Sequence, residues 1–168
     1  SHDQMEVGIW NATERSSFFE DILNSQDFPL DGLESIKHHS KQHQWLASRF
    51  LLCHLYPSAI QIYKKKKPML YNGPFVSFSH SDKLVAVSIS ARETGIDVQK
   101  LDAKICRIAP KFVNAEDEKS INLPSEVLSL SMIWSIKEAV FKVYGSNLPF
   151  KNIIIKEFNS VTDKALVH

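Results

Sequence analysis

The stretch FVSFSHSDKLVAVSIS, residues 75–90, carries the clearest strand pattern in the chain. Two largely apolar runs, 75–80 and 84–90, flank the polar turn SDK, and a second turn at 93–95 precedes the run IDVQ at 96–99. Short strands joined by tight polar turns form antiparallel sheets. We therefore predict a three-stranded β meander over residues 75–99.

Helical and extended segments precede this meander. The run EVGIW (6–10) predicts a strand, and SSFFEDILNS (16–25) predicts a helix with Thr13 or Ser16 as its N-cap. Residues 31–56 place apolar side chains three and four apart and stop before a proline. That spacing indicates one long helix or two in succession.

The remaining segments repeat this mixture of helices and strands. A strand is predicted at 60–63, before the meander. After the meander, Pro110 limits a helical pattern, and Asn114 precedes the acidic first turn of another helix. Residues 124–126 open a long helix that Gly145 ends, and NIIIKEF (152–158) predicts a closing strand. Helices between antiparallel β segments give the α+β class.

Composition indicates an ordinary globular protein. The chain has 168 residues, 43% apolar and 23% charged, with a formal net charge of +1, so we expect one domain and no nucleic-acid or membrane partner. Cys53 and Cys106 form no CxxC pair, and the start lacks a signal-peptide pattern, so a reduced, cytoplasmic protein is expected. The lysine run 64–67 is interpreted as a solvated loop.

Three histidines raise the possibility of zinc. His39 and His43 are four residues apart, and His38 is adjacent, so two of the three could share a helix face. No glutamate completes an HExxH motif and no third ligand is evident. We therefore favour the interpretation that these histidines belong to a helix surface.

The stretch WSIKEAVFKVYG, residues 134–145, combines charges with an apolar helical pattern. Trp134, Glu138 and Lys142 follow one another at four-residue intervals and form a stripe. A lone Glu–Lys pair of this kind is usually helix surface, worth about 0.2–0.5 kcal/mol. The predicted apolar face beside it consists of Met132, Ile133, Ile136, Ala139, Val140 and Val143.

Two residues of the predicted meander are further candidates. His80 ends its first strand, and Asp97 lies between Ile96 and Val98, whose side chains alternate to the opposite face. Each alone is more often structural than functional. Their combination with the charged helix carries more weight than either residue.

Together, SFSHS (77–81), GID (95–97) and WSIKEAVFK (134–142) resemble the three-motif signature of the 4′-phosphopantetheinyl transferase superfamily, in its Sfp-like, single-chain branch. The similarity runs from about Lys67 to Phe158, and QWLASRFLL (44–52) resembles a helix of the bacterial members. The resemblance implies two similar lobes within one domain, about 1–90 and 91–168. Each is a small antiparallel sheet packed against a long helix, with coenzyme A in a cleft between them.

The resemblance also implies an activity of the holo-[acyl-carrier-protein] synthase type. The phosphopantetheine arm of coenzyme A is transferred to a serine of an apo acyl or peptidyl carrier protein, and adenosine 3′,5′-bisphosphate is released. A single-chain pseudo-dimer favours a monomer. The alternative is a non-catalytic relative that binds coenzyme A or a carrier protein.

The matching motifs assign roles to individual residues. Asp97 and Glu138 are the expected Mg²⁺ ligands, because Mg²⁺ takes hard oxygen ligands from one or two carboxylates. Lys142 is expected on a phosphate, while Glu138 is also a candidate to take the serine proton. For Lys137, a contact with phosphate and exposure to solvent both stay open. Coenzyme A binding is expected from Lys67, Pro68, Ser79 and His80, with added positive potential from the lysine run 64–67.

Three positions depart from the family pattern. Gln99 replaces a second strand carboxylate, Gln44 stands near a common arginine, and Asp117 stands where a glutamate is common. A neutral amide is a weaker Mg²⁺ ligand, so the metal would keep an extra water. The two glutamines favour the non-catalytic alternative. Lys41, His43 and Arg49 are the neighbours that could compensate for Gln44.

Overall fold

The computed structural model describes residues 5–64, 67–145, 148–162 and 164–168, so Lys65 and Lys66 of the lysine run lie outside it. It is an α+β protein with small antiparallel sheets and helices, as predicted. The chain divides into two compact units, Ser1–Val98 and Gln99–His168. We describe each unit by itself.

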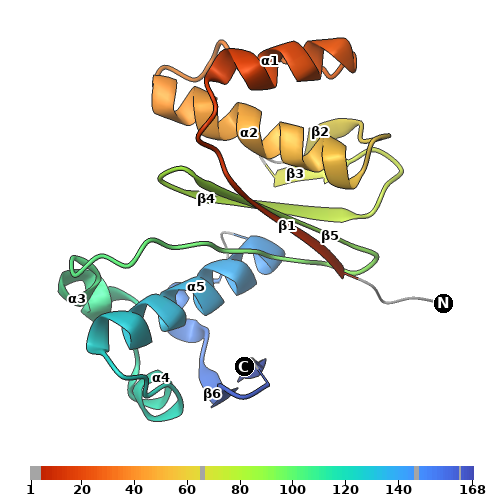
Figure 1. Cartoon of the computed structure of the whole chain (residues 1–168). Coiled ribbons are helices and arrows are strands. Elements are labelled where there is room, and N and C mark those ends of the chain that lie inside the picture. Colours follow the sequence, from red (N-terminus) through yellow and green to blue (C-terminus); the bar gives the residue numbers. More distant parts are fainter. Residues whose placement is uncertain (1–4, 65–66, 146–147, 163) are drawn as a thin grey trace. The chain divides into compact units, whose positions relative to one another are not determined.

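A three-stranded antiparallel sheet forms the centre of the first unit (Figure 1). The predicted hairpin is confirmed as β4 (Phe75–Ser81) and β5 (Leu84–Ser90). The predicted third strand, IDVQ, is wrong, because β1 (Met5–Asn11) occupies the other side of β5. The amides of Ile96 and Val98 bond instead to the hydroxyls of Ser77 and Ser79, at 3.2 and 3.1 Å. Side chains therefore replace the backbone ladder there.

Two helices cover one face of this sheet. Helix α2 (His39–Leu55) packs on the sheet, and α1 (Ser16–Ser25) lies on the far side of α2 (Figure 1). A Cβ added to Gly8 of β1 would meet the Leu51 side chain of α2 at 2.9 Å, so glycine permits the close approach. Helix α2 begins later than the predicted span 31–56, and Arg15, without a side-chain cap, precedes α1. The predicted Thr13 or Ser16 cap is thus wrong.

Small side chains line the other face of the sheet. Ser77 pairs with Ser88 and Ser79 with Ala86 across the β4–β5 register, so all four point to one side. Residues 94–98 bond to this face, where the hydroxyls of Thr94 and Ser88 lie 3.0 Å apart. The narrow side chains leave room for the segment that carries Asp97.

A second hairpin, β2 (Gln61–Lys64) and β3 (Lys67–Leu70), is tied to α2 by Arg49. The buried Arg49 guanidinium lies over the rings of Trp45 and Phe78, at 4.5 and 4.6 Å. Its Nη2 donates a 2.7 Å hydrogen bond to the hydroxyl of Tyr63 on β2. The hairpin that carries Lys67 is therefore anchored to α2.

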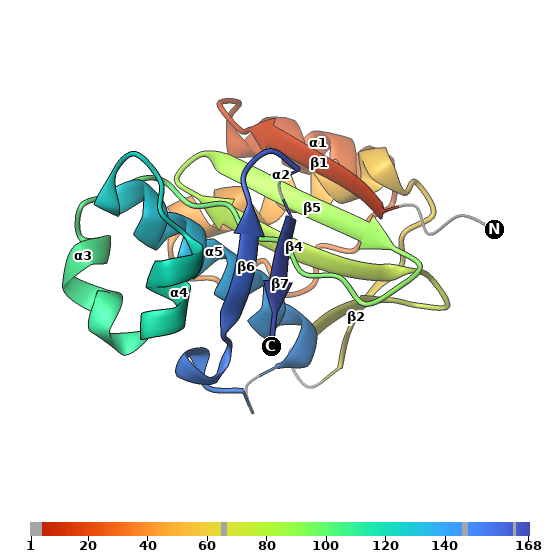
Figure 2. The same cartoon turned by 90° about the horizontal axis from the view of Figure 1, so that it is seen from below.

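In the second unit, shorter elements lie around a long helix (Figure 2). Helices α4 (Ala115–Ser120) and α5 (Glu126–Tyr144) begin where predicted, with Asn114 and Ser125 as their side-chain caps, and Gly145 follows α5 with φ of 84°. The closing strand is confirmed, and it pairs with a strand that was not predicted. Besides α4 and α5, the second unit contains α3 (Ile105–Ile108), a 3-10 helix (Ala109–Lys111), a 3-10 helix (Phe150–Asn152), β6 (Ile155–Asn159) and β7 (Lys164–Val167).

The buried face of α5 agrees only in part with the predicted one, of which Met132 and Ile136 pack against the core while partly exposed. Of the six residues predicted for the apolar face, Ile133 alone is buried, and it is joined by Leu130, Ser131 and Lys137. Apolar side chains cover most of the circumference of α5, so hydropathy does not select one face. The packing of the surrounding elements determines which face of α5 is buried. None of the helices in the described ranges has the length and apolar character needed to cross a membrane.

Candidate functional site

The first unit brings Ser79 and Asp97 into contact. Ser79 is 6% exposed, and its hydroxyl donates a 2.9 Å hydrogen bond to Oδ1 of Asp97. The same hydroxyl accepts the amide of Val98 at 3.1 Å. The half-buried Asp97 is thus held through its carboxylate by a residue of β4, which also binds the backbone amide of the next residue. Sequence reasoning named both residues but did not predict their contact.

His80 does not share this side of the sheet. It follows Ser79 on β4 and is exposed, so alternation directs its side chain to the opposite face. Lys67 and Pro68 lie elsewhere in the first unit, on β3. Of the residues predicted to bind coenzyme A, Ser79, His80 and the neighbouring pair Lys67 and Pro68 therefore occupy three separate places within this unit.

Lys67 and Pro68 line a pocket of about 230 Å³ in the first unit. Its wall combines apolar side chains, such as Met69 and Phe75, with the cationic side chains of Lys64 and Lys67 and the carboxylate of Glu93. The pocket is therefore apolar in part and carries charged groups of both signs. The prediction that Lys67 and Pro68 contact a nucleotide stays a prediction.

The second unit carries the charged stripe on α5. Glu138 and Lys142 lie one turn apart, and both are half-buried. Trp134, one turn before Glu138, stacks on Phe150 at 5.2 Å and meets Phe112 edge-on at 5.0 Å. The stripe therefore begins with a side chain that packs against the core of the second unit.

Lys137 is not a surface residue. Its side chain is 0% exposed, and its ammonium lies 2.5 Å from Oδ2 of Asp117, which is equally buried. The ammonium also donates to the carbonyl of Phe112 at 2.7 Å. Burial lowers the pKa of Lys137, and the hydrogen bond and charge of Asp117 oppose that shift. Both the phosphate contact and the solvent position expected for Lys137 are wrong.

The residues near the missing arginine have structural contacts. Gln44 is buried and donates to the carbonyl of Asp82 at 2.7 Å. A ring nitrogen of His43 lies 2.8 Å from the carbonyl oxygen of Glu14. Since Arg49 is buried against aromatic rings, Lys41 is the exposed cation among the three expected to compensate.

The described residues suit Zn²⁺ and Mg²⁺ differently. Within those residues, no group of three or more His, Cys, Asp or Glu side chains is arranged to hold a metal ion. The zinc hypothesis for the histidines gains no support from this. Mg²⁺ differs, because one or two carboxylates suffice when phosphate and water complete its shell. The Asp97 carboxylate, oriented by Ser79, fits that donor type.

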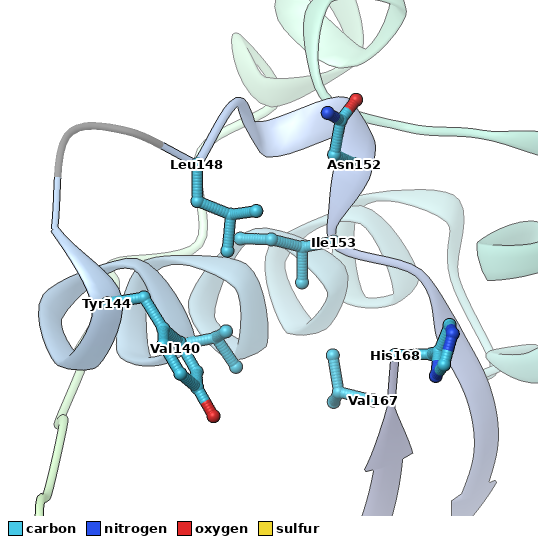
Figure 3. Close-up of a pocket in the computed structure, with 7 residues that line it drawn as sticks. All are labelled: Val140, Tyr144, Leu148, Asn152, Ile153, Val167 and His168. Carbon is cyan, nitrogen blue, oxygen red and sulfur yellow. The ribbon is translucent and has the colours of Figure 1, made fainter.

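A larger pocket, of about 400 Å³, lies in the second unit (Figure 3). Val140 and Tyr144 of α5 form one wall, and Ile153 forms another. Val140 is two residues from both Glu138 and Lys142, about 200° around the helix. The pocket therefore lies on another face of α5 than the charged stripe. Its remaining lining residues are Leu148, Asn152, Val167 and His168.

The side chains described so far define a class of chemistry. Carboxylates suited to Mg²⁺ and lysines suited to phosphate are the groups that proteins use to handle phosphate esters. A family model described as the 4′-phosphopantetheinyl transferase superfamily matches residues 93–166, which include Asp97, Glu138 and Lys142. The resemblance to that superfamily is thereby confirmed.

The chain is also similar to curated relatives. The chain is 33% identical over 89 residues to the 4′-phosphopantetheinyl transferase gsp of Aneurinibacillus migulanus, covering 46% of this chain and 37% of that protein. It is 28% identical over 89 residues to enterobactin synthase component D of Salmonella typhi, covering 50% and 38%. The matched part thus spans well under half the length of these relatives.

Proposed function

We propose that this protein transfers the 4′-phosphopantetheine arm of coenzyme A to a serine of an apo acyl or peptidyl carrier protein. The observation that carries the proposal is that Asp97, Glu138 and Lys142 all fall within the residues matched to the superfamily. The Ser79 bond, which orients the Asp97 carboxylate, supports it.

The reaction is a phosphoryl transfer. The serine oxygen forms a bond to the phosphorus that bears pantetheine, and the bond from that phosphorus to the leaving adenosine 3′,5′-bisphosphate breaks. Positioning and neutralisation of charge supply most of the catalysis in such reactions. Bound Mg²⁺ would neutralise pyrophosphate charge, with Asp97 and Glu138 as its carboxylate ligands.

The chain's own residues have the following proposed roles. Lys142 contacts a phosphate and stabilises the charge that develops on the leaving group. Glu138 accepts the serine proton, directly or through a water. Lys67 and Pro68 contact the nucleotide through their pocket, and His80, with Ser79, contacts a phosphate of coenzyme A. Membership of the Sfp-like branch, a monomeric state and a cytoplasmic location are parts of the same proposal.

Mass measurement of a carrier protein tests the proposal. The protein is mixed with coenzyme A, Mg²⁺ and apo carrier proteins of the acyl and peptidyl types, and each carrier is then weighed. We expect a gain of one phosphopantetheine on at least one of them. Coenzyme A binding without any gain would support the non-catalytic alternative and overturn the enzyme proposal.

Substitutions test the carboxylate roles. Asp97→Ala and Glu138→Ala are each expected to abolish transfer while circular dichroism shows an intact fold, because a loop and a helix both tolerate alanine. Wild-type activity in either variant would show that its assignment is wrong. Gln99→Glu is expected to raise Mg²⁺ affinity or leave it unchanged, because Gln99 is exposed and replaces a carboxylate of the family. A marked loss would contradict that role.

A further inference from the structure

A buried ion pair adjoins Glu138 in the sequence. Lys137 and Asp117 are both fully buried, although charged side chains rarely are. The Asp117 carboxylate accepts the amides of Asn114 and Ile155, at 3.0 and 2.9 Å, as well as the Lys137 ammonium. The charges are therefore well supplied with partners, which is the condition under which a buried pair is tolerated.

The pair joins several segments of the second unit. Lys137 belongs to α5 and Asp117 to α4, while Ile155 begins β6. The Lys137 ammonium also donates to the carbonyls of Phe112 and Phe150, at 2.7 and 3.3 Å. One ammonium group thus fixes α5 against three places in the chain, at Phe112, Asp117 and Phe150.

Such a contact fixes a helix differently from apolar packing. An apolar face can slide or rotate slightly at modest cost, and α5 is apolar around most of its circumference. A buried ammonium that moves away from its carboxylate loses its oppositely charged partner and its hydrogen bonds together, which costs much more free energy. Because each residue turns a helix by about 100°, the position of Lys137 also sets the direction of Glu138.

We infer that Lys137 and Asp117 are positioning residues, which set the rotation of α5 so that Glu138 and Lys142 are held for phosphoryl transfer. The inference rests on the proposed function for its activity readout. The pair contacts protein groups and no reacting atom in this arrangement, so its effect passes through Glu138 and Lys142.

The test replaces both charges together, since removal of one leaves the other buried and unpaired. The double variant Lys137→Met/Asp117→Asn is expected to fold, with kcat reduced about 100-fold and KM for coenzyme A little changed. The control is Lys156→Met/Glu116→Gln, which removes an exposed ion pair between β6 and α4, the two elements that Asp117 also joins. Its kcat should stay within twofold of wild type. A folded double variant with wild-type kcat would overturn the inference.

If the double variant does not fold, Lys137→Arg is tested instead, because arginine keeps the positive charge but carries it on a planar guanidinium. A folded Lys137→Arg protein with reduced kcat supports positioning, and one with wild-type kcat overturns it.

A readout without turnover separates this inference from the proposed function. Trp134 lies on α5 against Phe112 and Phe150, so its 5-fluorotryptophan resonance, assigned with Trp134→Phe, reports the setting of the helix. If the wild type transfers nothing, the proposed function fails, and this resonance decides the positioning claim. A shift in the double variant but not in the control supports it, and an unshifted resonance overturns it.

Discussion

The hydroxyl of Ser79 holds the carboxylate of Asp97 by a 2.9 Å hydrogen bond that spans 18 residues of sequence. The bond joins the middle residue of one family motif to the acid of the next. Ser77, two residues earlier on the same face, accepts an amide from the same segment. Both serines therefore bind backbone amides of this segment, and Ser79 also binds the carboxylate.

Ser79→Ala is expected to weaken Mg²⁺-dependent transfer, because the Asp97 carboxylate loses the donor that orients it. Loss of a residue that supports a metal ligand costs about 10–100-fold in metal affinity or activity. The measurement is transfer rate against Mg²⁺ concentration. Ser77→Ala is the matched control and should change the Mg²⁺ dependence by less than about twofold, since Ser77 receives the Ile96 amide. Equal effects in both variants would contradict the prediction.

Tyr63→Phe is expected to destabilise the first unit by about 1–3 kcal/mol, because a buried charged donor loses its acceptor. Burial already lowers the pKa of Arg49, and the charge and hydrogen bond of Tyr63 oppose that shift. Urea unfolding gives the free energy. Tyr71→Phe is the control, since Tyr71 is 59% exposed. A loss as large in Tyr71→Phe would assign the effect to something other than Arg49.

Asn114→Ala is expected to lower the free energy of unfolding by about 1 kcal/mol, as loss of an N-cap does. The Asn114 side chain accepts the amides of Glu116 and Asp117, at 3.1 and 3.0 Å. Arg15→Ala is the comparison at α1, where no side chain caps the helix. Urea unfolding should leave Arg15→Ala near wild type, and a similar loss there would argue against a capping effect.

Cys53 is expected to resist alkylation in the folded protein. Burial raises the pKa of its thiol to about 11 from an ordinary 9.0, so the reactive thiolate is scarce at pH 8. Cys106 is partly exposed and should react first. Iodoacetamide labelling followed by peptide mass spectrometry measures both rates, and urea should equalise them. Faster labelling of Cys53 than of Cys106 without urea would contradict its burial.

The same thiol makes stability depend on pH. Because the folded pKa lies above the unfolded one, the folded state holds the proton more tightly. The resulting stability is fully present below pH 9 and is lost as the pH rises through about 11. Urea unfolding at pH 8.5 and 10.5 should show a smaller loss in Cys53→Val than in wild type. Identical losses would rule out a contribution from Cys53.

Local signals in the sequence were sufficient for much of the fold. Asn114, Ser125 and Gly145 mark helix ends in the structure because capping depends on residues a few positions away. The β4–β5 hairpin followed from alternation and a short turn for the same reason. These features needed no knowledge of distant partners.

Distant partners explain the failures. IDVQ has the pattern of a strand, yet its amides bond to serine hydroxyls about nineteen residues earlier in the chain. No local pattern distinguishes a hydroxyl acceptor from a neighbouring strand. The pairing of β1 with β5 likewise joins segments about eighty residues apart, which alternation alone does not reveal.

By itself, the sequence determined the α+β class, several helix ends and the three motifs, two of which contain Asp97, Glu138 and Lys142. Those features depend on spacing and on short-range hydrogen bonds, both of which are written in neighbouring residues. The tertiary structure alone decided that Ser79 orients Asp97 and that Lys137 is buried with Asp117. A lysine in a charged motif is expected at the surface, and only partners from other segments, which supply a carboxylate and two carbonyls, make its burial favourable.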